Sequence, residues 1–286
     1  MKKLLITILI LIALVGGNVW AVTVDWMGYT WDLREGPTGG PGFGLWTSAN
    51  VDGPDGSGFL TIQITNPTGS SPIGAEMDSQ TTGLGYGTYK LVTGSRLDNL
   101  DKNIVFGGLF PYYGGSPAIE FDVGEVSSWD GADAEGYGVG VNYVSHNSWY
   151  NDFANRTHST AVMDSGEVHT FVFKWEAGQA TYDTYIGADT CGTLLKHSVH
   201  TTSIPVPSTE IAIINLWLYD NDGAATAAAA DADDIDAPAK DIILRSFSFE
   251  EAGTEVADDC SEPGGNPKLN IASGRYIING GRLTIN

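Results

Sequence analysis

Several short segments of this chain alternate apolar and polar residues and are separated by glycine, proline, asparagine, aspartate and serine. Side chains of a strand point alternately to the two faces of a sheet, so this pattern is typical of strands with one face in a core. An amphipathic helical period holds nowhere for three turns. Short strands joined by turns predict an all-β fold, an antiparallel β-sandwich or jelly roll. The segments are 59–65, 86–94, 118–123, 137–145, 169–176, 180–187, 211–219 and 241–251.

The first 21 residues have the pattern of a secretory signal peptide. Lys2 and Lys3 precede an apolar run, and the small residues at its end predict cleavage after Ala21. The alternative for this segment is an uncleaved membrane anchor. No later apolar run is long enough to cross a bilayer. We therefore expect a secreted protein, extracellular or periplasmic, that makes no membrane contact once the signal peptide is cleaved.

The mature chain is predicted to consist of one large domain and a short extension. Residues 22–251 contain the alternating segments and form the expected jelly-roll domain. The composition then changes, and residues 252–286 are predicted to be a linker and a short β segment. This segment could be a hairpin docked on the domain or the start of a truncated module. The two cysteines, Cys191 and Cys260, could pair in an oxidising compartment or stay reduced.

The formal net charge of −21 restricts the possible partners. A surface this acidic repels nucleic acid and anionic membranes, whereas a neutral polymer remains compatible with it. Solubility in an extracellular medium is the alternative explanation of the charge. The sequence has no P-loop, GxGxxG, GxSxG or HExxH motif and no cysteine–histidine zinc pattern. We expect a monomer with no nucleic-acid partner, no catalytic metal and no required cofactor.

A structural calcium ion is the one metal that the sequence leaves open. Asp220 and Asp222 precede an alanine- and aspartate-rich stretch at 224–236, and carboxylate oxygens suit calcium. Their spacing is not that of an EF-hand loop, and a solvated acidic loop is the alternative.

Three carboxylates stand close together in the segment 116–128. Glu120 and Asp122 are two positions apart and share a strand face, whereas regular alternation would send Glu125 to the opposite face. Gly124 suits a β-bulge, which inserts one residue and resets the alternation. A bulge at this glycine would return Glu125 to the face of the other two. Like charges side by side destabilise a strand, so their presence favours a functional site.

Two glutamates on one face suit the hydrolysis of a glycosidic bond with retention, which needs carboxyl groups about 5–5.5 Å apart. A bent strand would let the long side chains of Glu120 and Glu125 lean toward each other. One of them attacks the anomeric carbon, and the other, with a raised pKa, protonates the leaving oxygen. Asp122 between them would orient the nucleophile through a hydrogen bond, and its charge would help to keep a proton on Glu125.

The pattern Glu-x-Asp-x-x-Glu on a strand of a β-rich chain resembles the catalytic motif of glycoside hydrolase family 16. Three further stretches, 74–92, 167–187 and 214–222, are similar to strands of this family and occur in the family order, so the resemblance covers about residues 43–250. It implies a concanavalin A-like jelly roll. It also implies that Glu120 is the nucleophile, that Asp122 assists it, and that Glu125 is the acid/base.

The substrate is less well defined, because 99–113 departs from the tryptophan-rich stretch usual in the family and resembles a divergent bacterial branch. We expect cleavage of internal β-glycosidic bonds of a polysaccharide. The acidic charge favours a neutral β-1,3 or β-1,3-1,4 glucan over a sulfated polymer. The alternatives are a non-catalytic, lectin-like carbohydrate-binding sandwich, a transglycosylase with the same residues, and a structural surface protein with an incidental acidic strand.

Aromatic and polar side chains near the motif are candidate substrate contacts, because sugar rings stack on aromatic faces and sugar hydroxyls bind polar groups. Some of them lie in 145–153, which we expect to be a loop after a strand. Others lie on a late strand that lines the cleft in the family. The alternative for each aromatic residue is a role in capping the core. The candidates are Tyr112, Trp129, His146, Trp149, Tyr150, Asn215 and Trp217.

Overall fold

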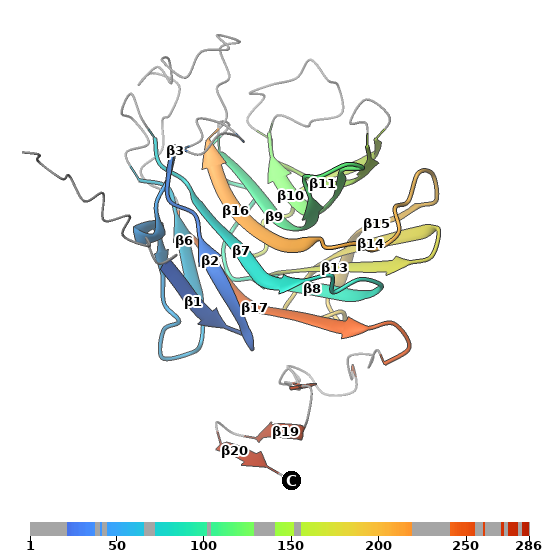
Figure 1. Cartoon of the computed structure of the whole chain (residues 1–286). Coiled ribbons are helices and arrows are strands. Elements are labelled where there is room, and N and C mark those ends of the chain that lie inside the picture. The colour runs from blue at the N-terminus through green and yellow to red at the C-terminus, as the bar shows by residue number, and fades with distance from the viewer. Residues whose placement is uncertain are drawn as a thin grey trace, which may run out of the picture.

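The computed structural model is a two-layered β-sandwich, which confirms the predicted all-β jelly roll (Figure 1). Its described residues are 22–37, 41, 45–65, 72–101, 104–128, 141–151, 156–218, 241–254 and 260, with the backbone of 270–271, 274–279 and 282–285. The predicted signal peptide, Trp129 and the candidate calcium loop lie outside the described residues. No helix among the described residues is long and apolar enough to cross a membrane.

One layer is an antiparallel sheet of eight strands in the order β1-β2-β7-β16-β9-β10-β11-β12. Its central position is taken by β9 and β16, and the carboxylate segment forms β10 beside them. The strands are β1 (Val22–Trp26), β2 (Tyr29–Leu33), β7 (Ala75–Thr82), β9 (Ile104–Tyr113), β10 (Ile119–Ser127), β11 (Tyr143–Tyr150), β12 (Thr157–Val162) and β16 (Ile211–Leu218).

The other layer is an antiparallel sheet of seven strands in the order β15-β14-β13-β8-β17-β6-β5. Its strands are β5 (Val51–Asp52), β6 (Leu60–Gln63), β8 (Gly87–Thr93), β13 (His169–Glu176), β14 (Gln179–Ile186), β15 (Thr193–His200) and β17 (Asp241–Glu251). Smaller elements are β3 (Gly36–Pro37), β4 (Leu45–Trp46), the 3₁₀ turn η1 (Ser48–Asn50), β18 (Asn270–Ile271), β19 (Gly274–Asn279) and β20 (Arg282–Ile285).

The core between the two sheets consists largely of alternate residues from each strand. Phe121 of β10 is completely buried, and its ring centroid lies 4.9 Å from that of Phe173 and 4.8 Å from that of Trp175 on β13. Burying one such side chain stabilises the fold by about 1.5–3 kcal/mol, so a slip of β10 by one residue would be costly. The core therefore determines which residues of β10 face outward.

The strand predictions are confirmed for most alternating segments and wrong for one loop. Residues 145–153 were expected to be a loop, but β11 runs through most of them to Tyr150. Its inward positions include His146 and Ser148 in place of apolar residues, which hid the alternation from the sequence.

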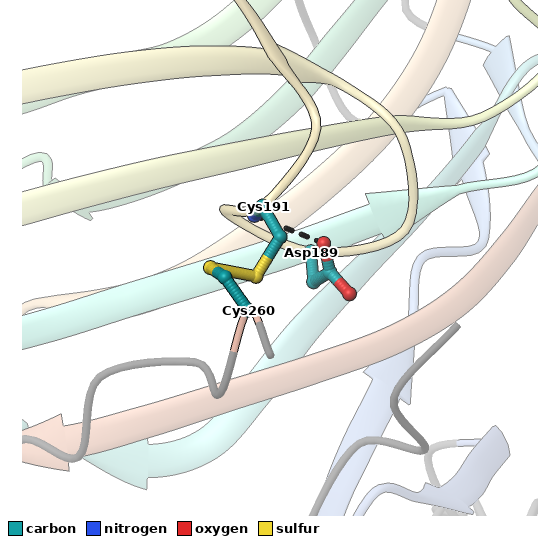
Figure 2. The surroundings of a disulfide bond; sticks show 3 residues. All are labelled: Asp189, Cys191 and Cys260. Carbon is teal, nitrogen blue, oxygen red and sulfur yellow. Dashed lines mark hydrogen bonds between the residues drawn. A yellow bond between two sulfur atoms is a disulfide. The ribbon is translucent and has the colours of Figure 1, made fainter. Parts of the chain in front are cut away.

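The two cysteines form a disulfide, which settles the alternatives left open by the sequence. Cys191 lies in the turn between β14 and β15, where its backbone N–H donates to Asp189 (Figure 2). Cys260 follows β17, so the bond joins the extension after the domain to the edge of the seven-stranded sheet.

Candidate active site

The candidate active site begins with a β-bulge at Gly124. The pairing of β10 with β11 shifts register between Val123 and Glu125, and Gly124 has a φ of +100°. The bulge predicted from the sequence is therefore confirmed. Phe121 and Val123 point into the core, as expected.

The bulge brings the three carboxylates to one face, the face of the eight-stranded sheet that is turned away from the seven-stranded sheet. We call it the site face. Glu120 lies opposite Trp149, Asp122 opposite Asn147, and Glu125 opposite Ser145. Directly paired residues of antiparallel strands share a face, and these three β11 residues alternate with inward-facing ones.

At the bulge, two positions leave no room for a side chain, and both are occupied by glycine. A Cβ at Gly124 would lie 2.2 Å from Cδ1 of Phe171 on β13. A Cβ at Gly108 of β9, where φ is +67°, would lie 2.4 Å from the carbonyl oxygen of Gly124. Both residues have backbone conformations that favour glycine. The pairing of β9 with β16 also shifts at this level, so irregularities in neighbouring strands bend the sheet together. Figure 1 shows the curvature of β16.

Glu120 is held in an environment that changes its acidity. The pKa of Glu120 is raised to about 7, chiefly by burial and also by the negative charge of Glu125. The neighbouring Trp149 indole and Asp122 carboxyl group oppose this rise in pKa, because they favour the ionised carboxylate. Asp122 thus affects the acidity of Glu120, and the hydrogen bond expected between them stays a prediction. The cluster combines burial, a nearby charge and neighbouring polar groups, which adjust carboxyl groups for acid–base work.

Tyr112 lies beside this cluster, as the sequence suggested. It pairs with Glu120 across β9 and β10 and therefore shares the site face. Burial raises the pKa of Tyr112, and the charge of Glu120 raises it further. Its hydroxyl therefore stays protonated at neutral pH and can donate a hydrogen bond.

Asn215 and Trp217 also lie on the site face, since the core of the sandwich contains their neighbours on β16. The Asn215 side-chain amide donates to Glu76 Oε2 at 2.9 Å. A Cβ at Gly107 would lie 2.0 Å from Asn215 Oδ1, so a glycine is required beneath this amide. Trp217 packs in a buried cluster with Trp46. Its exposed fraction is only 8%, which leaves a small part of the ring available for contact.

Sequence reasoning missed three charged residues of this face: Glu76, Arg34 and Asp78. Glu76 of β7 is buried, and Nη1 of Arg34, just after β2, donates to its Oε1 at 2.6 Å. The Arg34 guanidinium also stacks on the Trp46 ring, 4.7 Å from its centroid. Glu76 and Asp78 are two positions apart, as are Glu120 and Asp122. This spacing could have identified Glu76 and Asp78 from the sequence.

Asp78 is a second carboxyl group of the site face with an altered acidity. The pKa of Asp78 is raised to about 7, chiefly by burial and also by the charges of Glu76 and Asp32, while the charge of Arg34 lowers it. Asp32 lies directly opposite Asp78 in the pairing of β2 with β7. Among the described residues, no three histidine, cysteine or carboxylate side chains are grouped to hold a metal ion.

Two of the predicted substrate contacts lie on the wrong face. His146 is buried between the sheets, where its ring nitrogens lie 3.0 Å from Ser198 Oγ and 2.9 Å from Thr184 Oγ1. Tyr150 pairs with Ile119, a core residue, and so points away from the site face at the end of β11. The error came from treating a strand as a loop, because successive strand residues cannot all face a ligand. Of the three predicted residues in this stretch, Trp149 is the one on the site face.

Comparison with solved structures reveals similar folds. The β-glucanase of Bacillus licheniformis superposes with a TM-score of 0.56 at 20% identity, over 77% of this chain and 92% of that one. A Bacteroides ovatus mixed-linkage glucan GH16 protein, in complex with a G4G4G3G product, gives 0.57 at 12% identity, over 80% and 97%. A laminarinase from Flavobacterium sp. UMI-01 gives 0.54 at 16% identity, over 77% and 93%.

Comparison of the sequence alone finds no similar protein. No protein-family model matches this chain, and no curated protein matches it. The likeness therefore lies in the backbone, at identities where the sequence has diverged widely. The chain has the jelly-roll fold of the glycoside hydrolase family 16 enzymes.

Proposed function

We propose that this protein is a secreted, retaining glycoside hydrolase of family 16 that cleaves internal β-glycosidic bonds of a neutral glucan. The observation that carries the proposal is the placement of Glu120, Asp122 and Glu125 on one face by the bulge at Gly124. A sheet surface has no structural need for three adjacent carboxylates, since they repel one another. The fold shared with glucanases supports the same conclusion.

In the first step, the ionised Glu120 attacks the anomeric carbon and forms a covalent glycosyl–enzyme bond. Glu125 donates its proton to the glycosidic oxygen as the bond to the leaving sugar breaks. Asp122 and Trp149, which lie beside Glu120, oppose the effect of burial on its pKa and so favour the ionised carboxylate before the attack. Such orientation of a nucleophile lowers the barrier because less freedom is lost on the way to the transition state.

In the second step, the ionised Glu125 takes a proton from water, and the oxygen of that water attacks the same carbon. The bond to Glu120 breaks, and Glu120 leaves as a carboxylate. Two inversions at one carbon give retention of the anomeric configuration. Tyr112, beside Glu120, has a protonated hydroxyl that can donate to a sugar oxygen or to the carboxylate.

A neutral glucan fits the charge of the site face and of the whole chain. Glu76 and Asp78 add carboxyl groups to those of β10, and the formal net charge is −21. An anionic polymer would be repelled by this surface. The similar solved structures include a lichenase and a laminarinase, which supports β-1,3-1,4 and β-1,3 glucans as the first candidates. The disulfide supports export to an oxidising compartment.

The proposal is tested by measuring reducing-sugar release from lichenan, laminarin, agarose, carrageenan, xyloglucan and chitin. We expect release from lichenan or laminarin, and a loss of at least about 10³-fold in Glu120→Gln, because an amide is not a nucleophile. In Glu120→Ala, where the smaller side chain leaves room for it, azide should attack the anomeric carbon in place of the carboxylate and restore cleavage, giving a glycosyl azide of inverted configuration. Unchanged release in Glu120→Gln would disprove the assignment of the nucleophile. Binding of one polymer without any release would instead indicate a carbohydrate-binding protein.

A further inference from the structure

The inward side of β11 is polar where its neighbours are apolar. His146 and Ser148 are both buried and face the seven-stranded sheet, opposite Val123 and Phe121 of β10 respectively. A buried hydroxyl or imidazole is costly unless it is hydrogen-bonded. The partners of these two side chains therefore need an explanation beyond filling the core.

The partners of His146 and Ser148 come from β14 and β15, across the gap between the two sheets. Thr184 Oγ1 and Ser198 Oγ are hydrogen-bonded to the His146 ring. Ser148 Oγ lies 2.5 Å from the Tyr182 hydroxyl and 2.9 Å from Nδ1 of His200. The His146 and Tyr182 rings are stacked, with centroids 5.2 Å apart. We call these six side chains the polar layer.

The direction of one chain of hydrogen bonds within the polar layer can be deduced. The Tyr182 hydroxyl donates to the backbone carbonyl of Asn147 at 2.6 Å, so its oxygen must accept from Ser148. Ser148 then accepts from His200, whose Nδ1 carries the hydrogen. Burial lowers the pKa of His200 to about 4, which agrees with a neutral ring at ordinary pH. The chain runs from His200 through Ser148 and Tyr182 to the backbone of β11.

This chain ends directly behind the carboxylate cluster. Asn147 pairs with Asp122, and its neighbour Trp149 pairs with Glu120. Burial raises the pKa of Tyr182, the hydrogen bond from Ser148 lowers it, and the charge of Asp122 raises it. An apolar contact has little directional preference, whereas a hydrogen bond to a carbonyl restricts both the distance and the angle between the two groups.

We propose that the polar layer, through the hydroxyl of Tyr182, positions β11 so that Trp149 meets the carboxylate of Glu120. Tyr182 is thus a positioning residue for the hydrolysis and touches no substrate itself. The inference deepens the proposed function and rests on it for its kinetic consequence. Its structural consequence, the contact between Trp149 and Glu120, is independent of any substrate.

The core offers a matched control for removing this hydroxyl. Tyr89 of β8 is also a buried tyrosine, and its hydroxyl donates to a backbone carbonyl, that of Gly85, at 2.9 Å. Tyr182→Phe and Tyr89→Phe remove the same atom and the same kind of bond, but only the first is next to β11. Ser148→Ala is a second test variant, because it removes the donor to Tyr182 from the side of β11 itself.

The kinetic test uses the full-length mature protein on the glucan that it cleaves, well below the melting temperature of each variant. For Tyr182→Phe and Ser148→Ala we expect kcat to fall about 3- to 10-fold, as for one hydrogen bond lost, with KM nearly unchanged. We also expect the acid limb of the pH profile to move to higher pH. Tyr89→Phe should lower stability without either change. Equal kinetics in Tyr182→Phe and wild type would overturn the inference.

A measurement without substrate separates this inference from the proposed function. The titration of Glu120 can be followed by NMR of ¹³C-labelled glutamate carboxyl groups, with Glu120→Gln to assign the signal. We expect the midpoint to move to higher pH in Tyr182→Phe and Ser148→Ala, because Trp149, which lies opposite Glu120 and lowers its pKa, is held less firmly beside the carboxylate. The midpoint should stay in place in Tyr89→Phe. An unmoved midpoint would disprove the positioning role. If wild type cleaves no polymer while the midpoint moves, the proposed function fails and the positioning of Trp149 stands.

Discussion

At the scale of the residue, the site depends on polar side chains that are kept from water by their own strand neighbours. Glu120 lies between Tyr112 of β9 and Trp149 of β11, and this position explains why burial is the largest cause of its raised pKa. The pKa of a carboxyl group in such a place responds strongly to changes in its surroundings. Any change in its hydrogen bonds alters the pH at which the nucleophile ionises.

Replacing Trp149 with phenylalanine should shift the pH dependence of hydrolysis. The attack requires an ionised Glu120, so kcat/KM should rise with pH toward about 7, and it should fall again at higher pH, where Glu125 has lost the proton that it must donate. The Trp149 indole lowers the pKa of Glu120, so its loss in Trp149→Phe should move the acid limb of the profile to higher pH. At pH values on the acid limb, we expect kcat/KM to be about tenfold lower in Trp149→Phe than in wild type, as for the loss of a hydrogen bond to a charged group.

The control for this prediction is Trp26→Phe. Trp26 is a buried residue of β1 whose indole donates to the carbonyl of Gly58, so the same donor is lost away from the site. The measurement is reducing-sugar release between pH 4 and pH 9. A limb at the same pH in Trp149→Phe and Trp26→Phe would contradict the effect assigned to Trp149.

His146 should make the fold sensitive to acid. Burial lowers the pKa of His146 from 6.5 to about 3. Between these values the unfolded chain binds a proton that the folded chain does not, so the free energy of unfolding decreases as pH falls through this range. In His146→Gln, which keeps a polar side chain without titration there, urea unfolding should show a weaker dependence on pH between 7 and 4.

Ser198→Ala serves as the comparison for His146→Gln. It removes a partner of the His146 ring but leaves the ring buried, so stability should drop at every pH while the slope is retained. If His146→Gln and Ser198→Ala showed the same slope, another group would be responsible for the acid sensitivity.

At the scale of the element, the kinked pair of β9 and β10 produces the site. Gly124→Ala would introduce a Cβ against Phe171 at a positive φ, so two costs add. We expect destabilisation by more than about 3 kcal/mol, together with loss of hydrolysis. Gly178→Ala is the matched control. This turn residue has a φ of +76° but nothing within 4 Å of its added Cβ, and its cost should be about 1 kcal/mol.

Both variants can be compared by urea unfolding at neutral pH, with activity measured at a temperature where each is folded. A cost for Gly124→Ala no larger than that for Gly178→Ala would mean that Phe171 moves aside easily. Full activity in a folded Gly124→Ala would show that Glu125 does not need the bulge.

The elements also show which parts of the structure the sequence could predict. The bulge at Gly124 was predictable, because an odd spacing between carboxylates and an adjacent glycine are both local signals. The ion pair of Arg34 with Glu76 was not, since it joins residues 42 positions apart on paired strands. The inward direction of His146 was missed because a polar residue in a core has partners that only the fold brings together.

At the scale of the whole molecule, the two sheets act on the site from opposite sides. The seven-stranded sheet supplies Phe171 beneath the bulge and Tyr182 beneath β11. The eight-stranded sheet supplies the carboxylates and their neighbours. The geometry of the site face is therefore a property of the packed sandwich, and a change in the far layer can reach the site without any contact with a substrate.

The disulfide should stabilise the whole molecule and leave the chemistry untouched. It closes a loop with a sequence separation of 69. In the chain-entropy description a loop of this size contributes about 4 kcal/mol by restricting the unfolded chain. We expect Cys191→Ser/Cys260→Ser to lose up to this amount in urea unfolding, and to keep the kcat of wild type at 25 °C. Equal stability with and without a reducing agent would show that the bond adds nothing to the fold.

The contact of Gly108 with the Gly124 carbonyl also has a historical consequence. Neither strand can straighten or acquire a side chain at this point while its neighbour stays as it is, so the two glycines would be expected to be inherited as a unit. A lineage that lost either glycine would have little selection left to keep its glutamates. Loss of catalysis along a line of descent could therefore begin at a position that bears no reactive group at all.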